Sequence, residues 1–175
     1  MFKQLKQLTI KTCKMKKLKQ AAFISLLFLT ISPITISAQV RGKQSNVTIV
    51  QGMYNDFGKG NVPGVLASMD KNVEWNEAEN FPYWESKPFS GPDAVVKGVF
   101  ARIGEEWEYW KLTDLQLHKM DNNMVLGTGR YQAKYKKNGA VINAQFAHVW
   151  TLKDKKVIKF QQYTDTKQVS NAIAQ

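Results

Sequence analysis

Cysteine is almost absent from this sequence of 175 residues, because its single thiol is Cys13, near the amino terminus. The chain beyond Cys13 therefore depends on neither disulfides nor a thiol nucleophile, and it tolerates an oxidising compartment. No cysteine follows the one long apolar run of the sequence, so a lipoprotein anchor is not indicated.

The motifs of common cofactor enzymes are missing as well. The sequence has no Gly-x-Gly-x-x-Gly after a strand pattern, no phosphate loop and no Gly-x-Ser-x-Gly elbow. Its two histidines, His118 and His148, are too few for a zinc triad, and His118 is expected to face solvent. We therefore expect no cofactor and no metal. Four acidic residues lack the spacing of a calcium loop and are expected to form a solvated rim: Glu74, Glu77, Glu79 and Glu85.

Only one long uncharged run is present, from Ala21 to Ser37. Lysines precede it and the small residue Ala38 follows it, which is the order of a secretory signal. A transmembrane helix is disfavoured because a bilayer core needs about 20 apolar residues and Pro33 interrupts this run. We expect residues 1–38 to be a signal peptide, with a start at Met15 as an alternative. The mature chain is then periplasmic or secreted and has no stable membrane anchor.

The formal net charge of +11 overstates how basic the mature chain is. Residues 1–38 carry seven lysines and no acidic residue, which leaves 18 of the 25 basic residues against all 14 acidic ones. Much of the positive charge thus belongs to the signal, and the remaining lysine clusters fall at expected turns. We therefore expect no nucleic-acid partner.

The mature chain is long enough for one domain and shows no internal repeat. Residues 39–45 are read as a short lead-in, 46–167 as the domain and 168–175 as a C-terminal tail. Apolar residues recur every three or four positions from Asn46 to Phe57, which predicts an amphipathic helix. Pro63 suits the first turn of a second helix. A third helix is predicted from Pro92 to about Trp107 or Trp110.

The second half of the sequence changes to a period of two, which is typical of strands. A weak strand is also predicted at 71–78, and the segment 80–92 combines three prolines with four aromatics, as expected of a loop. Hairpin turns are predicted at 121–123, 137–139 and 154–156. Helices followed by an antiparallel meander predict an α+β domain, in which a curved sheet wraps around the N-terminal helices.

Several segments, in this order, resemble the SnoaL-like family of the nuclear transport factor 2 and ketosteroid isomerase superfamily. They are FGKGN before VPGVLASMD, VEW at 73–75, FSGPDAV at 89–95, AHVWTL at 147–152 and IKFQQYTDT at 158–166. The resemblance covers residues 46–167. It implies a cone-shaped antiparallel sheet with a mostly apolar pocket in its mouth, and a homodimer that pairs the sheets.

The fold hosts several activities, so each must be matched residue by residue. In ketosteroid isomerase a carboxylate base follows the first strand and a tyrosine of the first helix helps to form an oxyanion hole. Here those positions hold Trp75 and Met53, with Tyr54 beside the latter. The related epoxide hydrolases use an Asp–Arg–Asp arrangement. Asp165 and Arg130 match two of its members, but the second carboxylate is missing.

Our candidate catalytic residues are Asp165 and His148, the pair that resembles the acid/base residues of SnoaL-like cyclases. Alternation predicts that Asp165 shares a strand face with Tyr163, and the pair converges with His148 if both strands turn these faces to the cone. The alternatives are a turn-capping Asp165 and a core histidine. Candidate ligand-binding residues are the following: Trp75, Tyr83, Arg130 and Tyr163.

We thus expect an exported pocket protein that binds a small, largely apolar organic ligand. Cofactor-free acid/base catalysis of the isomerase, cyclase or hydrolase type is a further possibility. The alternative is a non-catalytic ligand-binding or dimeric assembly module. An open cone reached by both Asp165 and His148 favours the enzyme, whereas a cone filled by bulky residues favours the module; the residues concerned are Phe146, Trp150 and Phe160.

Overall fold

The computed structural model describes residues 44–174, so the expected signal peptide lies outside the described residues. The first helix, α1 (Asn46–Gly58), begins where the Ser45 side chain accepts a hydrogen bond from the Thr48 backbone N–H, 3.1 Å away. The second, α2 (Val62–Ala67), is capped in the same way by Asn61. Both helices were predicted and are confirmed.

The third helical stretch has three parts, namely α3 (Pro92–Val95), a π-helical turn η1 (Val96–Phe100) and α4 (Ala101–Glu106). It starts after Gly91, whose φ of 81° lies in the left-handed region that favours glycine. Gly98 lies against the Phe89 ring, and a Cβ there would approach the ring to 2.2 Å. The helix ends at Glu106, slightly earlier than predicted, because Trp107 is already extended and begins a strand.

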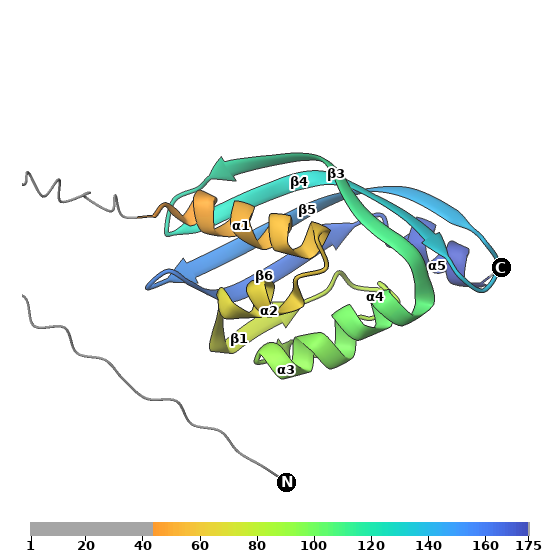
Figure 1. Ribbon diagram of the computed structural model, residues 1–175, viewed down its shortest axis with the longest axis horizontal. Coiled ribbons are helices and arrows are strands. Elements are labelled where there is room, and N and C mark those ends of the chain that lie inside the picture. Colours follow the sequence, from red (N-terminus) through yellow and green to blue (C-terminus); the bar gives the residue numbers. More distant parts are fainter. Residues whose placement is uncertain (1–43, 175) are drawn as a thin grey trace, which may run out of the picture. The chain divides into compact units, whose positions relative to one another are not determined.

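Six strands form one sheet in the order β2-β1-β6-β5-β4-β3. Their bounds are β1 Met69–Asn76, β2 Phe89–Ser90, β3 Trp107–Lys119, β4 Met124–Tyr135, β5 Val141–Lys153 and β6 Lys156–Thr164. Neighbouring strands are antiparallel except β1 and β6, which run parallel. The sheet is curved and not closed, and Figure 1 shows the long strands β3 to β6 lying side by side.

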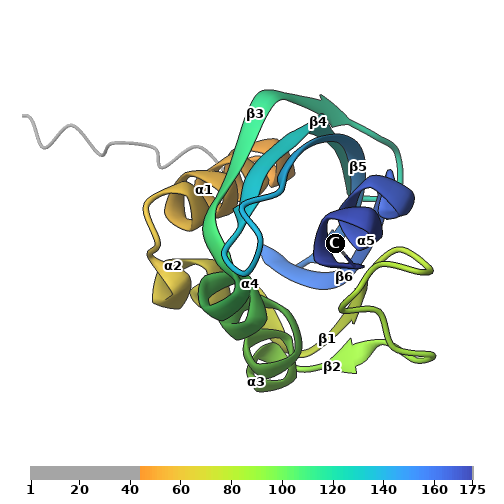
Figure 2. The ribbon, with the colours of Figure 1, turned by 90° about the vertical axis from the view of Figure 1, so that its right-hand side faces the viewer.

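Helices α1 to α4 lie across the open side of the curved sheet, as seen along the strands in Figure 2. Buried apolar side chains from α1, β4, β5 and β6 fill the space between, among them Val50, Val125, Trp150 and Phe160. The expected α+β architecture, a curved sheet wrapped around helices, is therefore confirmed. No helix in the part of the chain that the structure describes is long and apolar enough to cross a membrane.

The tight turns also fall where they were predicted. Positive φ angles at Asn122, Asn123, Gly139, Asp154 and Lys155 mark the three connections between β3, β4, β5 and β6. Asparagine, aspartate and glycine tolerate this conformation best, which explains why those residue types signalled the turns.

The end of the chain differs from expectation. The sequence predicts a tail at residues 168–175, but Thr166–Ala174 forms helix α5, which packs against β5. Its Val169 and Ala172 are buried. The Asp165 side chain accepts a hydrogen bond from the Gln168 backbone N–H, 3.1 Å away, as the N-cap of this helix.

Candidate functional site

The pairing of β5 with β6 decides which side chains face the concave side of the sheet. His148 lies opposite Gln162, and Ala147 lies opposite Tyr163. Side chains opposite one another share a sheet face, so His148 and Gln162 point inward and both are buried, whereas Tyr163 points outward. The expected convergence of Asp165 and His148 is therefore wrong.

Three of the candidate residues belong to the outer face. Tyr163 is 57% exposed, and Asp165 caps α5 at the end of the same strand. Arg130 lies on this face too, where its Nε donates to Asn143 Oδ1 at 2.7 Å. Together with neighbouring polar side chains they line an open groove on the convex side, away from the inner cavity.

The concave side contains a cavity of about 60 Å³, measured as the space open to the centre of a water molecule. Its walls come from α1, α2, the η1–α4 segment and every strand except β2. Apolar and aromatic side chains make up most of the lining, namely Met53, Phe57, Val65, Trp75, Phe81, Val99, Phe100, Ile103, Trp110, Leu112, Trp150 and Phe160. The polar lining residues are Tyr54, Glu77, Tyr131, His148 and Gln162. The bulky residues Trp150 and Phe160 thus narrow the cavity without filling it.

His148 lies between two tyrosines at the polar end of the cavity. Its Nδ1 is 2.7 Å from the Tyr54 hydroxyl and its Nε2 is 2.5 Å from the Tyr131 hydroxyl. The Trp150 indole N–H donates to the Tyr54 oxygen, and the Gln162 amide donates to the Tyr131 oxygen, each at 3.0 Å. Burial lowers the pKa of His148 from 6.5 to about 3, so the imidazole is neutral at physiological pH.

Glu77 is the one carboxylic acid in the cavity lining. It is 3% exposed, and its Oε1 accepts a hydrogen bond of 2.6 Å from the indole N–H of Trp75. Its Oε2 has no hydrogen-bond partner among the described residues. Burial raises the pKa of Glu77 from 4.5 to about 7, an effect that the neighbouring Trp75 and Gln162 side chains partly offset. The expectation that Glu77 belongs to a solvated rim is wrong, whereas Glu74, Glu79 and Glu85 are exposed as expected.

Trp75 lines the cavity, as expected of a ligand-binding candidate. Its ring stacks on Phe160 with 3.8 Å between ring centroids and meets Phe100 and Trp150 edge to face. Trp75 therefore both shapes the aromatic wall and holds Glu77 in place.

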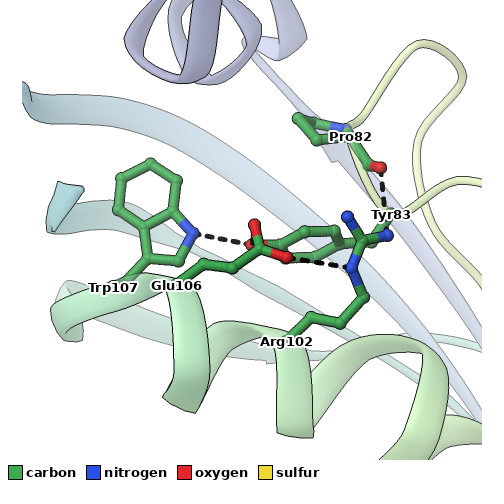
Figure 3. Close-up of polar contacts among 5 residues, drawn as sticks. All are labelled: Pro82, Tyr83, Arg102, Glu106 and Trp107. Atoms are coloured by element: carbon green, nitrogen blue, oxygen red, sulfur yellow. Dashed lines mark hydrogen bonds and ion pairs between the residues drawn. The ribbon is translucent and has the colours of Figure 1, made fainter. Parts of the chain in front are cut away.

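Tyr83, the other aromatic candidate, lies outside the cavity and secures the aromatic loop (Figure 3). Its hydroxyl donates to Glu106 at 2.9 Å and accepts from the Trp107 indole at 2.7 Å. The Arg102 guanidinium lies 4.0 Å from the centre of the Tyr83 ring and donates to both Glu106 and the Pro82 carbonyl. These contacts tie the loop to α4, while Phe81 of the same loop faces the cavity.

Sequence reasoning missed the roles of Glu77, Tyr131 and Gln162. One signal was available for Gln162, because the apolar Phe160 two residues earlier marks the inward face of β6. No group of three or more metal-ligating side chains occurs between residues 44 and 174.

The chain is similar to known proteins in both sequence and structure. Residues 50–160 match the model of a family described as a SnoaL-like domain. An NTF2-like protein from Burkholderia thailandensis is 30% identical, with a TM-score of 0.70 over 75% of this chain and 98% of that one. No curated protein matches the chain.

Two further solved structures share the fold at lower identity. TerC, co-crystallised with polyporic acid, is 20% identical, with a TM-score of 0.65 over 74% of this chain and 98% of that one. A Pseudomonas putida protein named as a candidate polyketide cyclase is 12% identical, with a TM-score of 0.63 over 72% and 96% of the two chains.

Proposed function

Because this chain belongs to the SnoaL-like domain family, we propose that its cavity binds a small, largely apolar organic molecule that carries a polar oxygen. The observation that carries the proposal is a cavity with aromatic walls and a buried carboxylate oxygen, Glu77 Oε2, that has no partner among the described residues. A buried polar atom without a partner is costly, so a ligand gains affinity when its hydroxyl donates to the carboxylate or when its carbonyl accepts from the protonated carboxyl. The co-crystal of TerC with polyporic acid supports an organic ligand for this fold.

A second candidate function is cofactor-free proton transfer, as in isomerases. It is favoured by the pKa of about 7 at Glu77, which leaves this carboxyl able both to accept and to release a proton near neutral pH. A carboxylate there removes a proton from the carbon next to a ligand carbonyl. A tyrosine hydroxyl stabilises the negative oxygen that results.

The proposed base is thus Glu77, in place of Asp165, which caps α5 on the outer face. His148 keeps a place in the cavity, but each of its ring nitrogens lies within hydrogen-bond distance of a tyrosine hydroxyl. It therefore acts on a ligand through a tyrosine hydroxyl and not directly.

Cyclohexanone in D2O at pH 7 tests both functions. We expect the protein to bind cyclohexanone and to speed deuterium incorporation next to its carbonyl. Glu77→Gln keeps the size of the side chain and removes the titrating group, so it should reduce the protein-dependent rate by a factor of about 10². Binding should change little, because the amide N–H of glutamine can donate to the ligand carbonyl in place of the protonated carboxyl. Rates are followed by NMR and affinity by titration.

The exposed Glu79→Gln is the matched control and should behave as the wild type. Binding without exchange would leave a non-catalytic ligand-binding module, and the absence of binding would remove this ligand class altogether.

We further propose that residues 1–38 direct export and that the mature chain forms a homodimer through the outer face of the sheet. Exposed Tyr163 and Val141 on that face support the second point, at 57% and 64% exposure. N-terminal sequencing of protein from its native compartment should begin near Gln39, and light scattering on the mature chain should give the mass of two copies. An uncleaved terminus or a monomer would contradict the respective proposal.

A further inference from the structure

The contacts of His148 determine which hydroxyl of the site is free to donate a hydrogen bond. Two short contacts join the imidazole to hydroxyls, one at Nδ1 with Tyr54 and one at Nε2 with Tyr131. A neutral imidazole has one N–H, which donates in one contact, while the bare nitrogen accepts in the other. The tyrosine that accepts from the imidazole N–H then keeps its own hydroxyl proton free. One of the two tyrosines, and only one at a time, is therefore a spare donor.

The two distances indicate which tyrosine this is. A hydrogen bond donated by N–H typically spans about 2.7–3.2 Å, whereas one donated by O–H is shorter, about 2.5–3.0 Å for an oxygen acceptor. The 2.5 Å contact at Nε2 fits a hydroxyl of Tyr131 that donates to the ring. The 2.7 Å contact at Nδ1 lies within both ranges, and because a neutral imidazole has one N–H, this contact is then the one in which the ring donates to Tyr54.

We propose that His148 is held as the Nδ1–H tautomer and thereby makes the Tyr54 hydroxyl the free donor of the cavity, for an acceptor oxygen such as a ligand ketone. The ligand half of this statement rests on the proposed function. The tautomer half concerns the protein alone. His148 is a positioning residue in this scheme, since it acts on the ligand through Tyr54.

In this assignment the Tyr54 oxygen accepts two hydrogen bonds. It receives the Trp150 indole N–H in addition to the imidazole N–H, so both lone pairs are used and a further contact must come from its own proton. Gly127 leaves room for this hydroxyl, because a Cβ at Gly127 would lie 2.6 Å from the Tyr54 oxygen. Gly127 pairs with His148 across the sheet, so this close approach lies beside the imidazole.

NMR of ¹⁵N-labelled protein reads the tautomer directly. The chain has two histidines, and a His118→Ala variant identifies the signals of His148. We expect a protonated Nδ1 and a bare Nε2 in the free wild type. Tyr54→Phe removes the acceptor at Nδ1, so the proton should move to Nε2. Tyr131→Phe leaves the Tyr54 acceptor in place and should keep the Nδ1–H form.

A protonated Nε2 in the wild type would overturn the proposal, and so would a tautomer that Tyr54→Phe leaves unchanged. The wild-type spectrum decides the first point without any variant. The Tyr→Phe changes keep the ring and remove one oxygen, which favours a folded variant.

A pair of ligands tests whether the Tyr54 hydroxyl donates to a ligand oxygen. Cyclohexanone has an acceptor oxygen, and methylenecyclohexane has the same shape without it. The ratio of their affinities should fall about fivefold to tenfold in Tyr54→Phe and stay near the wild-type value in Tyr131→Phe. The opposite pattern would overturn the donor assignment. If neither compound binds the wild type, the proposed function fails for this ligand class, while the NMR result still decides the tautomer.

Discussion

A Glu77→Gln variant will lose about 3 kcal/mol of stability relative to the wild type as the pH falls from 7 to 4.5. Burial raises the pKa of Glu77 from 4.5 to about 7, so in this interval the folded protein holds a proton that the unfolded chain has released. Proton binding then favours the folded wild type increasingly as the pH falls. Glutamine does not titrate, so the variant has no such gain.

His148 works in the opposite direction. Its pKa falls from 6.5 to about 3 on folding, so below pH 6.5 the unfolded chain binds a proton that the folded protein does not bind. Its contribution to stability is complete above pH 6.5 and falls by about 5 kcal/mol by pH 3. In the wild type the two effects largely cancel between pH 4.5 and 6.5. In Glu77→Gln only the loss of stability due to His148 remains.

Urea unfolding at a series of pH values from 3.5 to 8 measures this difference. Glu79→Gln is the matched control, because Glu79 is exposed two residues further along the chain. Its curve should follow that of the wild type. Parallel curves for Glu77→Gln and the wild type would show that Glu77 titrates as it does in water, and that would remove it as a base near neutral pH.

Trp75→Ala will lower the free energy of unfolding by about 3–5 kcal/mol, the usual cost of truncating a large buried aromatic side chain. Trp75 is 5% exposed and contacts three aromatic rings, one of them stacked at 3.8 Å. Its removal also deprives Glu77 of its hydrogen-bond donor, so both carboxyl oxygens are left without a partner. Chemical denaturation followed by circular dichroism gives the value.

Trp84→Ala is the control for this experiment. Trp84 is 41% exposed, so its truncation should change the free energy of unfolding by no more than about 0.5 kcal/mol. Similar losses in the two variants would contradict the assignment of Trp75 to the cavity wall.

The helices and turns were predictable because local chemistry determines them. Pro63 and Gly91 stand at helix starts, and Asn122 and Gly139 adopt positive φ in the turns that their residue types indicated. The strands of the second half were predictable from their period of two, which is also a local pattern. In both cases the decisive interactions lie within a few residues along the chain.

The faces of the last two strands were not predictable in the same way. Alternation tells which residues of one strand share a face, but it does not relate that face to the neighbouring strand. A register shift between Thr151 and Leu152, next to the turn, sets that relation. As a result Gln162 faces His148, whereas Tyr163 and Asp165 face outward.

The environment of Glu77 depends on contacts that are distant in sequence. Glu77 follows β1 in a segment rich in acidic residues, a composition that predicts exposure to solvent. Its burial comes from the cavity, whose lining includes Tyr131 and Gln162 of β4 and β6. No local pattern encodes such a contact, so the proposed base emerged only from the structure.

The parallel pairing of β1 with β6 has a consequence for how the chain folds. Trp75 and Glu77 are made early in synthesis, but Phe160 and Gln162 emerge close to the end, so the cavity has no complete wall until nearly the whole chain is available. Contacts of such long sequence separation slow folding, because a large loop must be ordered before they form. A chain that stops before β6 contains the segments of the amphipathic helices and of the β3–β4–β5 meander, yet its first strand has only the two-residue β2 to pair with.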